Sequence, residues 1–456
     1  MQDQLIDNIA ATTGLEPQQV AAQISRPPKL DQGDLAFPCF ALAKQRKMSP
    51  VECATALAAE LELPAGIARA EALGPYLNFF VDRTELTRRT IDTALQQGHE
   101  VGSRPAHDEC MIVEYSSPNI AKPFHVGHLR TTLIGHSLVQ IYRHLGYQVE
   151  GINHLGDWGT QFGFVFAGCE LWGKPEDPDV DELVEIYKRA TALRKAQDSG
   201  VVNDEDRDKP DVNQMARDYF VRLQAEDKDA VEFWQWCLDI SMKYLRASYK
   251  RLGINFDHYH GESFYSDMLP EIEQMLRDSG ILEESRGDLG IELEKPLGFV
   301  RIFAADGRSL YITRDIATAI YREKHFKPTQ IKYVVAAQQN LHFKQLIGIM
   351  QRLGHPVADK MQHVSFGFVP GQGTRGGGAI SLRQFLNEMY QHALDAYKNQ
   401  VTKKPEGVDE SAVAEAVAVG ATYFYYLSRS NVKDLQFDWK TALNFQGDTG
   451  PYLQYA

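Results

Sequence analysis

Apolar residues recur along the chain with two different periods, and these periods predict where its helices and strands lie. A short β-branched run at 111–113 predicts a strand, and leucines and an isoleucine at helical spacing predict a helix over 125–144. Another strand is expected at 147–153. The three elements together make one strand–helix–strand unit of ordinary size.

Strand and helix patterns continue to alternate in the second half of the chain, which predicts an open parallel sheet in an α/β fold. Asp306 and Gly307 form a hairpin-turn signal behind a predicted strand at 298–303. An aromatic and apolar stripe within a predicted helix at 229–252 is interpreted as core rather than as a surface for stacking bases. The remaining elements are expected at 50–63, 85–97, 315–324 and 411–427 (helices) and at 76–81, 291–293, 331–336 and 364–369 (strands).

Shifts in composition divide the chain into three parts. Residues 1–107 are expected to form a small unit of mixed helices and strands, and residues 108–391 the sheet unit. A charged, Pro- and Asp-rich stretch at 173–213 predicts an exposed connection, so an insertion around 170–290 is expected within the sheet unit. Residues 392–456 are predicted to be a mostly helical segment.

Composition narrows the class of protein. Of the 456 residues, 43% are hydrophobic and 24% are charged, as in ordinary soluble globular proteins. No apolar stretch reaches 18 residues, and no basic region followed by an apolar run opens the sequence, so a membrane-spanning or secreted protein is not expected. Five scattered cysteines without a C-x-x-C pair indicate reduced thiols, a cytoplasmic location and no structural metal. The net charge of −13 does not favour RNA binding over the whole surface, although a local basic face would suffice.

The strongest chemical signal follows the strand at 111–113. A loop containing Ser, Pro and Asn leads to His125, Gly127 and His128, which fall in the first turn of the predicted helix. Free backbone N–H groups and the positive end of the helix dipole favour a phosphate there, and Gly127 has no Cβ to hold a nucleotide away from the backbone. Two histidines three positions apart can also be a metal pair or surface residues. A zinc site, however, needs a third ligand in a recognisable motif, and neither H-E-x-x-H nor paired C-x-x-C is present.

Two neighbouring blocks of sequence carry a family resemblance. The string from Glu114 to His128 (EYSSPNIAKPFHVGH) resembles the nucleotide-binding signature of class I aminoacyl-tRNA synthetases in its arginyl-tRNA synthetase form. The block NHLGDWGTQFG at 153–163 is similar to the one that follows in that family. Nearer the N-terminus, KLDQGDLAF at 29–37 and LGPYLNF at 73–79 resemble the family's N-terminal domain. The resemblance implies that this domain docks the elbow of a tRNA, and the alternative is a packing domain without an RNA contact.

The resemblance implies a Rossmann-like catalytic domain with a parallel sheet, an N-terminal α+β domain and a C-terminal helical segment. Such a protein activates L-arginine with ATP, which carries Mg²⁺ as its counter-ion, and transfers the arginine to the 3′-terminal adenosine of tRNA(Arg). His125 and His128 would hold the polyphosphate of ATP and neutralise its charge, with Gly127 between them.

A second signature of the class I family is a flexible, lysine-containing loop that binds phosphate. It is expected at 371–378 (GQGTRGGG), where the position of its second lysine is occupied by Gly376. Many arginyl-tRNA synthetases that lack this lysine use the one before the histidines, which is Lys122 in this sequence. Thr374 and Arg375 are expected to contact phosphate together with the backbone of Gly376.

Arginine selection is implied by further matched residues. A guanidinium is planar and permanently charged, so carboxylates with in-plane oxygens recognise it best. The string YITRDIA at 311–317 resembles the arginine-binding helix start of the family, which implies Tyr311 and Asp315 as guanidinium contacts and Glu114 as a second carboxylate. Taken singly, Asp315 could be a helix N-cap and Glu114 a surface charge at a strand end. The amino and carboxylate end of arginine is expected to contact Asn119, His125 and Gln339.

The expected function is therefore that of an AMP-forming arginine-tRNA ligase, monomeric and cytoplasmic. Two alternatives stay open: another H-x-G-H nucleotidyltransferase, and a weakly active or non-catalytic RNA-binding paralogue. Gly376 motivates the second alternative, as does the string FQGDTGPYLQYA at 445–456, which matches the family where its helical anticodon-binding domain begins. The sequence is expected to be either truncated or a natural short paralogue.

Overall fold

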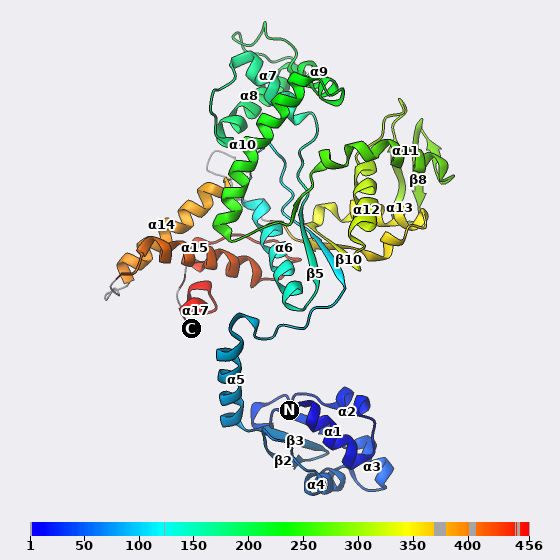
Figure 1. Cartoon of the computed structure of the whole chain (residues 1–456), viewed down its shortest axis with the longest axis vertical. Coiled ribbons are helices and arrows are strands. Elements are labelled where there is room, and N and C mark those ends of the chain that lie inside the picture. The colour runs from blue at the N-terminus through cyan, green and yellow to red at the C-terminus, as the bar shows by residue number, and fades with distance from the viewer. Residues whose placement is uncertain are drawn as a thin grey trace. The chain divides into compact units, whose positions relative to one another are not determined.

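The computed structural model of the chain consists of two compact units, Met1–Ser103 and Arg104–Ala456 (Figure 1). The residues that the structure describes are 2–122, 124–368, 380–400, 407–442, 444 and 447–455. Within these residues, no helix is both long enough and apolar enough to cross a membrane.

In the first unit, helices pack on a three-stranded antiparallel sheet. The strands are β1 (Leu35–Pro38), β2 (Ile67–Leu73) and β3 (Tyr76–Val81), in the order β1-β3-β2. The helices are α1 (Gln2–Thr13), α2 (Pro17–Gln23), α3 (Phe40–Arg46), α4 (Pro50–Glu60) and α5 (Arg83–Gln97). Buried side chains from helices and strands form one core that includes Leu57, Leu77 and Phe79. The strand predicted at 76–81 is confirmed as β3, and the helices predicted at 50–63 and 85–97 are confirmed as α4 and α5.

The second unit is built on a five-stranded parallel sheet, which confirms the predicted α/β fold. Its order is β11-β10-β4-β5-β6, and every neighbouring pair is parallel. The strands are β4 (Cys110–Glu114), β5 (Gln148–Asn153), β6 (His258–Tyr259), β10 (Gln330–Ala336) and β11 (Met361–Phe366). The central strands β4 and β10 are buried over most of their length, as expected for strands covered on both faces.

Helices cover this sheet and form the parts that extend from it. They are α6 (Val126–His144), α7 (Gln161–Trp172), α8 (Val180–Ser199), α9 (Val212–Gln224), α10 (Lys228–Leu252), α11 (Leu269–Asp278), α12 (Ile312–Phe326), α13 (Asn340–Arg352), α14 (Leu382–Gln400), α15 (Glu410–Leu427), α16 (Trp439–Ala442) and α17 (Gly450–Tyr455). A small antiparallel sheet of β7 (Glu283–Ser285), β8 (Asp288–Leu293) and β9 (Gly298–Phe303) lies beside α11 and α13. Figure 1 shows α10 running from the group α7–α9 towards the parallel sheet.

One sequence-based expectation was wrong in detail, and another was confirmed. The stretch at 173–213 is not only an exposed connection, because it contains α8, whose apolar stripe buries Leu183 and Leu193. The hairpin turn predicted at Asp306 and Gly307 is confirmed, because the chain folds back along the end of β9 and Ser309 forms an antiparallel bridge with Phe303. Within the turn, the Gly307 N–H donates to the carbonyl oxygen of Ala304 (2.8 Å).

The stripe along α10 is part of the core, as predicted. Cys237 and Leu252 are buried, and the aromatic members of the stripe pack against the same cluster. Trp234 also donates a hydrogen bond from its indole N–H to the carbonyl oxygen of Asp157 (2.7 Å). Helix α10 therefore connects the inserted helices to the sheet unit through these contacts.

Candidate active site

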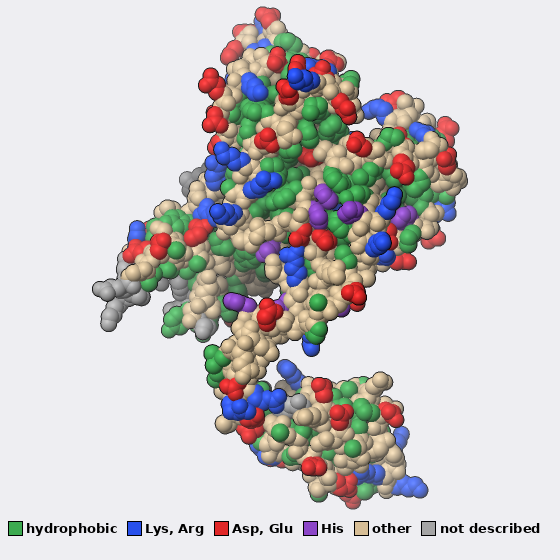
Figure 2. All heavy atoms as spheres, viewed as in Figure 1, with side chains coloured by type: hydrophobic (Ala, Val, Ile, Leu, Met, Phe, Trp, Pro, Cys, Tyr) green, Lys and Arg blue, Asp and Glu red, His purple; other side chains and the backbone are tan. Residues whose placement is uncertain are grey.

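The candidate site lies at the carboxyl ends of the central parallel strands, where open α/β sheets bind their ligands. A cavity of about 430 Å³ opens there between the first turn of α6 and the ends of β10 and β11. It is lined by Ser116, Ser117, His125, Gly127, His128, Thr131, Val334, Val335, Ala336, Gln338, Phe366 and Phe368. Its volume falls in the range of sites for small molecules and cofactors. In the face shown in Figure 2, histidine and acidic side chains lie side by side near the middle of the larger unit.

The loop between β4 and α6 has an unusual backbone. Ser116, Ser117 and Ala121 adopt positive φ angles of 71°, 47° and 56°. Such angles are costly for residues with a Cβ and persist only where the surroundings enforce them. Helix α10 supplies part of that support, because the Tyr249 hydroxyl lies 2.7 Å from Ser116 Oγ. The inserted segment thus shapes the loop that leads to the histidines.

His125 and His128 form a reciprocal hydrogen-bonded pair at the start of α6. His125 is the N-cap, and its Nδ1 accepts from the Gly127 N–H (3.0 Å). His128 Nδ1 accepts in turn from the His125 N–H (3.2 Å). Because both Nδ1 atoms are acceptors, each neutral imidazole carries its proton on Nε2. The two rings, whose centroids are 4.1 Å apart, therefore offer Nε2–H donors.

The expectation of free backbone N–H groups at this helix start was wrong. The Val126 N–H donates to the carbonyl oxygen of Ile380 (3.3 Å), and the His128 N–H donates to that of His125 (2.9 Å). The Gly127 N–H is used by the His125 ring, as described above. A Cβ on Gly127 would lie 2.7 Å from Cε1 of that ring, so the glycine makes room for the His125 side chain. This helix start therefore offers histidine Nε2–H groups, rather than these backbone amides, as hydrogen-bond donors.

Burial keeps both histidines neutral. It lowers the pKa of His128 to about 3, and it also lowers the pKa of His125. Protonation of either ring would also require breaking a hydrogen bond in which Nδ1 is the acceptor. The pair is suited to donating hydrogen bonds to an anion, whereas positive charge has to come from another residue.

Lys122 is the one cation in the described part of the loop, three positions before His125. Burial lowers its pKa, and the Glu262 carboxylate opposes that shift. Within the described part of the chain its ammonium makes neither a hydrogen bond nor an ion pair, so it is available to a ligand. Thr374, Arg375 and Gly376, like the whole second signature at 371–378, lie outside the described residues.

The two signature blocks are in contact. The Ile120 N–H donates to the carbonyl oxygen of Gly156 (3.1 Å), and the Gly156 N–H donates to that of Pro118 (3.0 Å). A Cβ on Gly156 would lie 2.4 Å from Oδ1 of Asn119, so only glycine leaves room for this amide. Asn119 itself is solvent-exposed and able to meet a ligand.

Asp157 in the second block positions a residue that sequence reasoning missed. Its buried carboxylate accepts from the N–H (2.8 Å) and the Oγ–H (2.6 Å) of Ser263. These bonds fix the neighbouring Glu262, whose Oε1 accepts from the Tyr311 hydroxyl at 3.5 Å. Burial raises the pKa of Glu262 to about 7; the Arg314 guanidinium opposes this rise and the Asp315 carboxylate adds to it.

Asp315 lies in the first turn of α12, one turn from the N-cap Tyr311. The suggestion that Asp315 itself caps the helix was wrong. Its Oδ2 is 2.9 Å from Nε2 of His342, a second residue to which sequence reasoning gave no role. The Asp315 hydrogen bond raises the pKa of His342. The Tyr311 hydroxyl and the carboxylates of Asp315 and Glu262 thus form one interacting acidic cluster, called the acidic pocket below.

Glu114 is not a surface charge, because its side chain is buried at the end of β4. Its Oε2 is 2.6 Å from NH1 of Arg322, a fully buried arginine of α12. The charge of Glu114 is therefore already balanced by a direct ion pair. Glu262 makes no such ion pair among the described residues, although the Arg314 guanidinium and the Lys122 ammonium interact with its carboxylate electrostatically. Gln339 is exposed just after β10, at the same edge of the sheet.

Glu262 and His342 were not predicted, because neither lies in a sequence pattern long enough to be recognised. Glu262 follows a strand of two residues, β6, which is too short to show a period. His342 lies at the start of α13, three residues after Gln339. This short spacing is the only feature of the sequence that indicates it. In the described part of the chain, no group of three or more His, Cys, Asp or Glu side chains could hold a metal ion.

Comparison with protein families gives two matches that together cover most of the chain. Residues 90–439 match the model described as "tRNA synthetases class I (R), catalytic domain". Residues 1–81 match the model of the arginyl tRNA synthetase N-terminal domain.

Individual relatives agree with these matches. An arginine–tRNA ligase of Streptococcus mutans serotype c is 38% identical over 98% of this chain and 78% of its own length. Another, from Clostridioides difficile, is 39% identical over 97% of this chain and 77% of its own length. In fold, the chain is similar to the arginyl-tRNA synthetase of Thermus thermophilus, with a TM-score of 0.73, 24% identity and coverage of 100% of this chain and 80% of that one. The corresponding structure from Plasmodium falciparum gives a TM-score of 0.74 at 21% identity, with coverage of 100% and 78%.

Proposed function

Because this chain belongs to the arginyl-tRNA synthetase family, we propose that it is an AMP-forming arginine-tRNA ligase that charges tRNA(Arg). The single observation that supports this best is the pairing of a neutral His125–His128 donor site with an acidic pocket at one edge of the sheet. The alternatives, another nucleotidyltransferase or a non-catalytic paralogue, are not favoured, because catalytic and N-terminal matches occur in one chain.

In the first step, a carboxylate oxygen of arginine attacks the α-phosphorus of ATP, and the bond to the β,γ-pyrophosphate breaks. The protein forms no covalent bond, so its work is to align the two substrates and to stabilise charge on the phosphates. The Nε2–H groups of His125 and His128 donate to phosphate oxygens, and the Lys122 ammonium adds positive charge. Mg²⁺ arrives with ATP as its counter-ion, and the cavity wall of Val334 and Phe366 receives the adenosine.

Arginine lies with its guanidinium in the acidic pocket. Asp315 and Tyr311 contact it directly, and Glu262 supplies a second carboxylate from the opposite side of the pocket. Glu114 contributes through the electric field of its carboxylate, whose position is fixed by the ion pair with Arg322. Asn119, His125 and Gln339 hold the amino and carboxylate end of the amino acid. Thr374, Arg375 and the backbone of Gly376 complete the contacts to phosphate.

In the second step, the 2′-hydroxyl of the 3′-terminal adenosine of tRNA attacks the arginyl carbonyl carbon, and AMP leaves. The N-terminal part, at 1–107, docks the elbow of the tRNA, and the catalytic part, at 108–391, carries its insertion around 170–290. The segment at 392–456 leads towards the anticodon-binding region. The protein acts as a monomer in the cytoplasm.

The test is charging of tRNA(Arg) transcript with radiolabelled arginine by the wild type and by Asp315→Asn. Wild-type protein is expected to give an alkali-labile arginyl ester. Asp315→Asn is expected to raise the KM for arginine strongly, because a permanently charged group loses one of its buried counter-charges, at a cost of about 3–5 kcal/mol. Asp267→Asn, at an exposed position near the pocket, serves as the control. An unchanged KM for arginine in Asp315→Asn would contradict the pocket assignment.

A further inference from the structure

The start of α14 is hydrogen-bonded to the histidine segment. The Leu382 N–H donates to the carbonyl oxygen of Phe124 (2.8 Å), and Ser381 forms an antiparallel bridge with His125. With the bond from the Val126 N–H to the carbonyl oxygen of Ile380, these contacts join residues 380–382 to residues 124–126 through the backbone. The backbone position of His125 therefore depends on where α14 begins.

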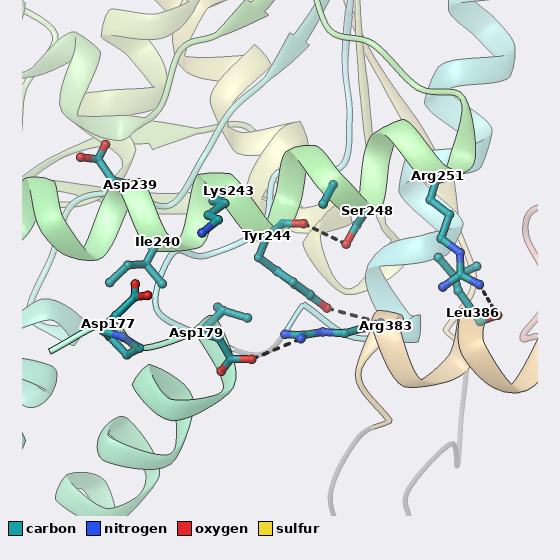
Figure 3. A pocket seen from close by; sticks show the side chains of 13 residues that line it. Asp177, Asp179, Asp239, Ile240, Lys243, Tyr244, Ser248, Arg251, Arg383 and Leu386 are labelled. Atoms are coloured by element: carbon teal, nitrogen blue, oxygen red, sulfur yellow. Dashed lines mark hydrogen bonds and ion pairs between the residues drawn. The ribbon is translucent and has the colours of Figure 1, made fainter. Parts of the chain in front are cut away.

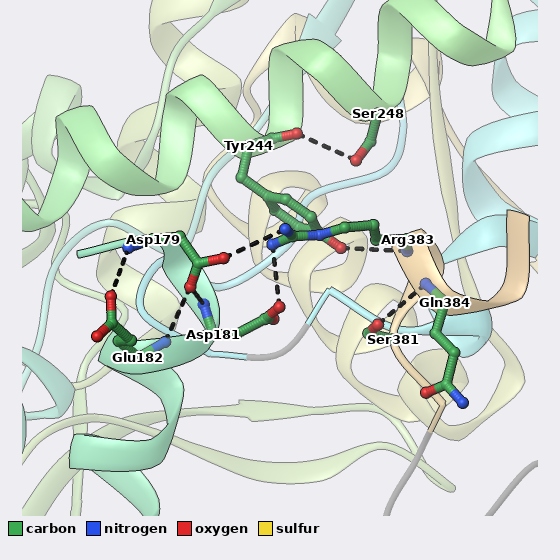
Figure 4. A network of polar contacts seen from close by, with 8 residues as sticks. All are labelled: Asp179, Asp181, Glu182, Tyr244, Ser248, Ser381, Arg383 and Gln384. Atoms are coloured by element: carbon green, nitrogen blue, oxygen red, sulfur yellow. Dashed lines mark hydrogen bonds and ion pairs between the residues drawn. The ribbon is translucent and has the colours of Figure 1, made fainter. Parts of the chain in front are cut away.

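The next residue, Arg383, contacts the first turn of α8. Its NH1 lies 3.2 Å from Asp179 Oδ2, and its NH2 lies 3.0 Å from Asp181 Oδ2 (Figure 4). Asp179 is the N-cap of α8, so its own position is fixed by the N–H groups of Asp181 and Glu182. Both terminal nitrogens of the Arg383 guanidinium therefore form ion pairs with the N-terminal turn of the inserted helix α8.

Arg383 also meets α10. Its backbone N–H donates to the Tyr244 hydroxyl (3.4 Å), and its guanidinium carbon lies 5.0 Å from the centre of the Tyr244 ring. A cavity of about 530 Å³ lies beside these contacts, between α10, the start of α8 and the start of α14 (Figure 3). Close packing is absent on that side, so the polar contacts of Arg383 and the ring of Tyr244 fix the first turn of α14 there, while the buried side chains of Leu382 and Phe385 fix its inner side.

The first turn of α14 is stiff enough to transmit this position. The Gln384 N–H donates to Ser381 Oγ (3.2 Å), which closes the turn around Arg383. Leu382 is fully buried beneath it. A shift of Arg383 by the length of a lost ion pair would therefore move Ser381, and with it the N-cap residue His125.

We propose that Arg383 is a positioning residue for the His125–His128 pair, which it fixes by joining the first turn of α14 to the inserted helices α8 and α10. The inference rests on the proposed function only in taking the histidines as the phosphate-binding donors. Since both rings are held by the capping bonds of the same turn, a displaced His125 backbone misplaces both Nε2–H donors. ATP binding should suffer, whereas the acidic pocket on α12 should not.

The experiment measures the dissociation constant of ATP by calorimetry without arginine, so that its result does not depend on activity. Arg383→Ala is expected to weaken ATP binding about 5-fold while the KM for arginine stays within about 2-fold of wild type. Arg383→Lys, which keeps a positive charge facing Asp179 and Asp181, is expected to retain at least half of the wild-type affinity. ATP affinity that follows this charge while the KM for arginine stays constant distinguishes positioning of the histidines from a general loss of structure.

Arg251→Ala is the matched control. Arg251 joins α10 to Glu415 (2.5 Å) and to Asn387 (2.7 Å), so it ties similar helices together without contacting residues 380–382. It is expected to leave ATP affinity within about 2-fold of wild type, and thermal melting of each variant verifies that it is folded. Equal loss of ATP affinity in Arg251→Ala and Arg383→Ala, or no loss in Arg383→Ala, would overturn the proposal. Failure of the wild type to activate arginine while these ATP affinities follow the expected pattern would count against the proposed function alone.

Discussion

At the scale of single residues, the histidine pair is suited to donating hydrogen bonds rather than to supplying positive charge. A pKa of about 3 for His128 leaves its ring neutral over the physiological range. The negative charge that develops on the phosphates of ATP during adenylate formation still has to be balanced. Among the described residues of the loop, Lys122 is the one cation. Its contribution to balancing this charge can therefore be measured by substituting it.

Lys122→Ala is expected to lower the rate of arginyl-adenylate formation by at least ~10-fold, which corresponds to about 1.4 kcal/mol of lost transition-state stabilisation. The reason is the removal of the ammonium that faces the phosphates in our account. Arginine-dependent exchange between pyrophosphate and ATP measures the effect. Lys344→Ala, at an exposed position on α13, should be neutral. A wild-type rate in Lys122→Ala would show that the charge is balanced by other groups.

Glu262 gives the arginine pocket a pH dependence. Its pKa of about 7 means that it is partly protonated in the free protein near neutral pH and loses its proton when a guanidinium binds. Below that pH, kcat/KM for arginine is expected to fall about 10-fold per pH unit, because only the deprotonated form offers the second carboxylate. Above it, the value should level off.

The variant Glu262→Gln distinguishes the titration of Glu262 from that of His342, whose pKa is raised by its hydrogen bond with Asp315. The variant is expected to have a lower kcat/KM for arginine and to lose the decline between pH 7 and pH 5.5. Persistence of the decline in Glu262→Gln would assign it to His342 instead.

At the scale of elements, the ion pair between Arg322 and Glu114 joins α12 to β4. Both side chains are buried, so removal of one partner leaves an uncompensated charge in the interior. Arg322→Met is expected to lower the free energy of unfolding by about 3–5 kcal/mol, measured by urea denaturation. Arg301→Met, which breaks an exposed pair with Asp288, should cost about 1 kcal/mol or less. Similar values for the two variants would mean that Arg322 does not hold α12 in place.

Elements with a long, regular period could be predicted from sequence. The strands β3 and β10 and the helices α6 and α15 agree with their predicted ranges to within a residue or two at each end. Helix α8 was hidden, because its charged outer face dominates the composition and its apolar stripe is narrow.

The candidate site was predictable only where its residues belong to contiguous motifs. Sequence placed His125, His128 and Asp315 on elements that the structure brings to one edge of the sheet. Glu262 depends on Asp157, more than a hundred positions away, and on a strand of two residues. Whether a carboxylate such as Glu114 is free or already paired is likewise a tertiary property that no local pattern encodes.

At the scale of the whole molecule, the parallel sheet brings two groups of candidate site residues to one edge. The loop after β4 leads to His125 and His128, and the segments after β6 and β9 carry the acidic pocket. The inserted helix α10 supports the loop, and α14 supports the histidines. The central claim is that this edge activates arginine and selects it by the charge of its guanidinium.

The most direct test is ATP–pyrophosphate exchange by the wild-type chain with tRNA(Arg) present, with arginine compared against citrulline. Citrulline has nearly the same shape as arginine, but its urea group is neutral and would leave the carboxylates of Asp315 and Glu262 unpaired. We expect exchange with arginine and at least ~100-fold less with citrulline, in line with the cost of an uncompensated buried charge. Equal exchange with the two amino acids, or none with arginine, would contradict the account.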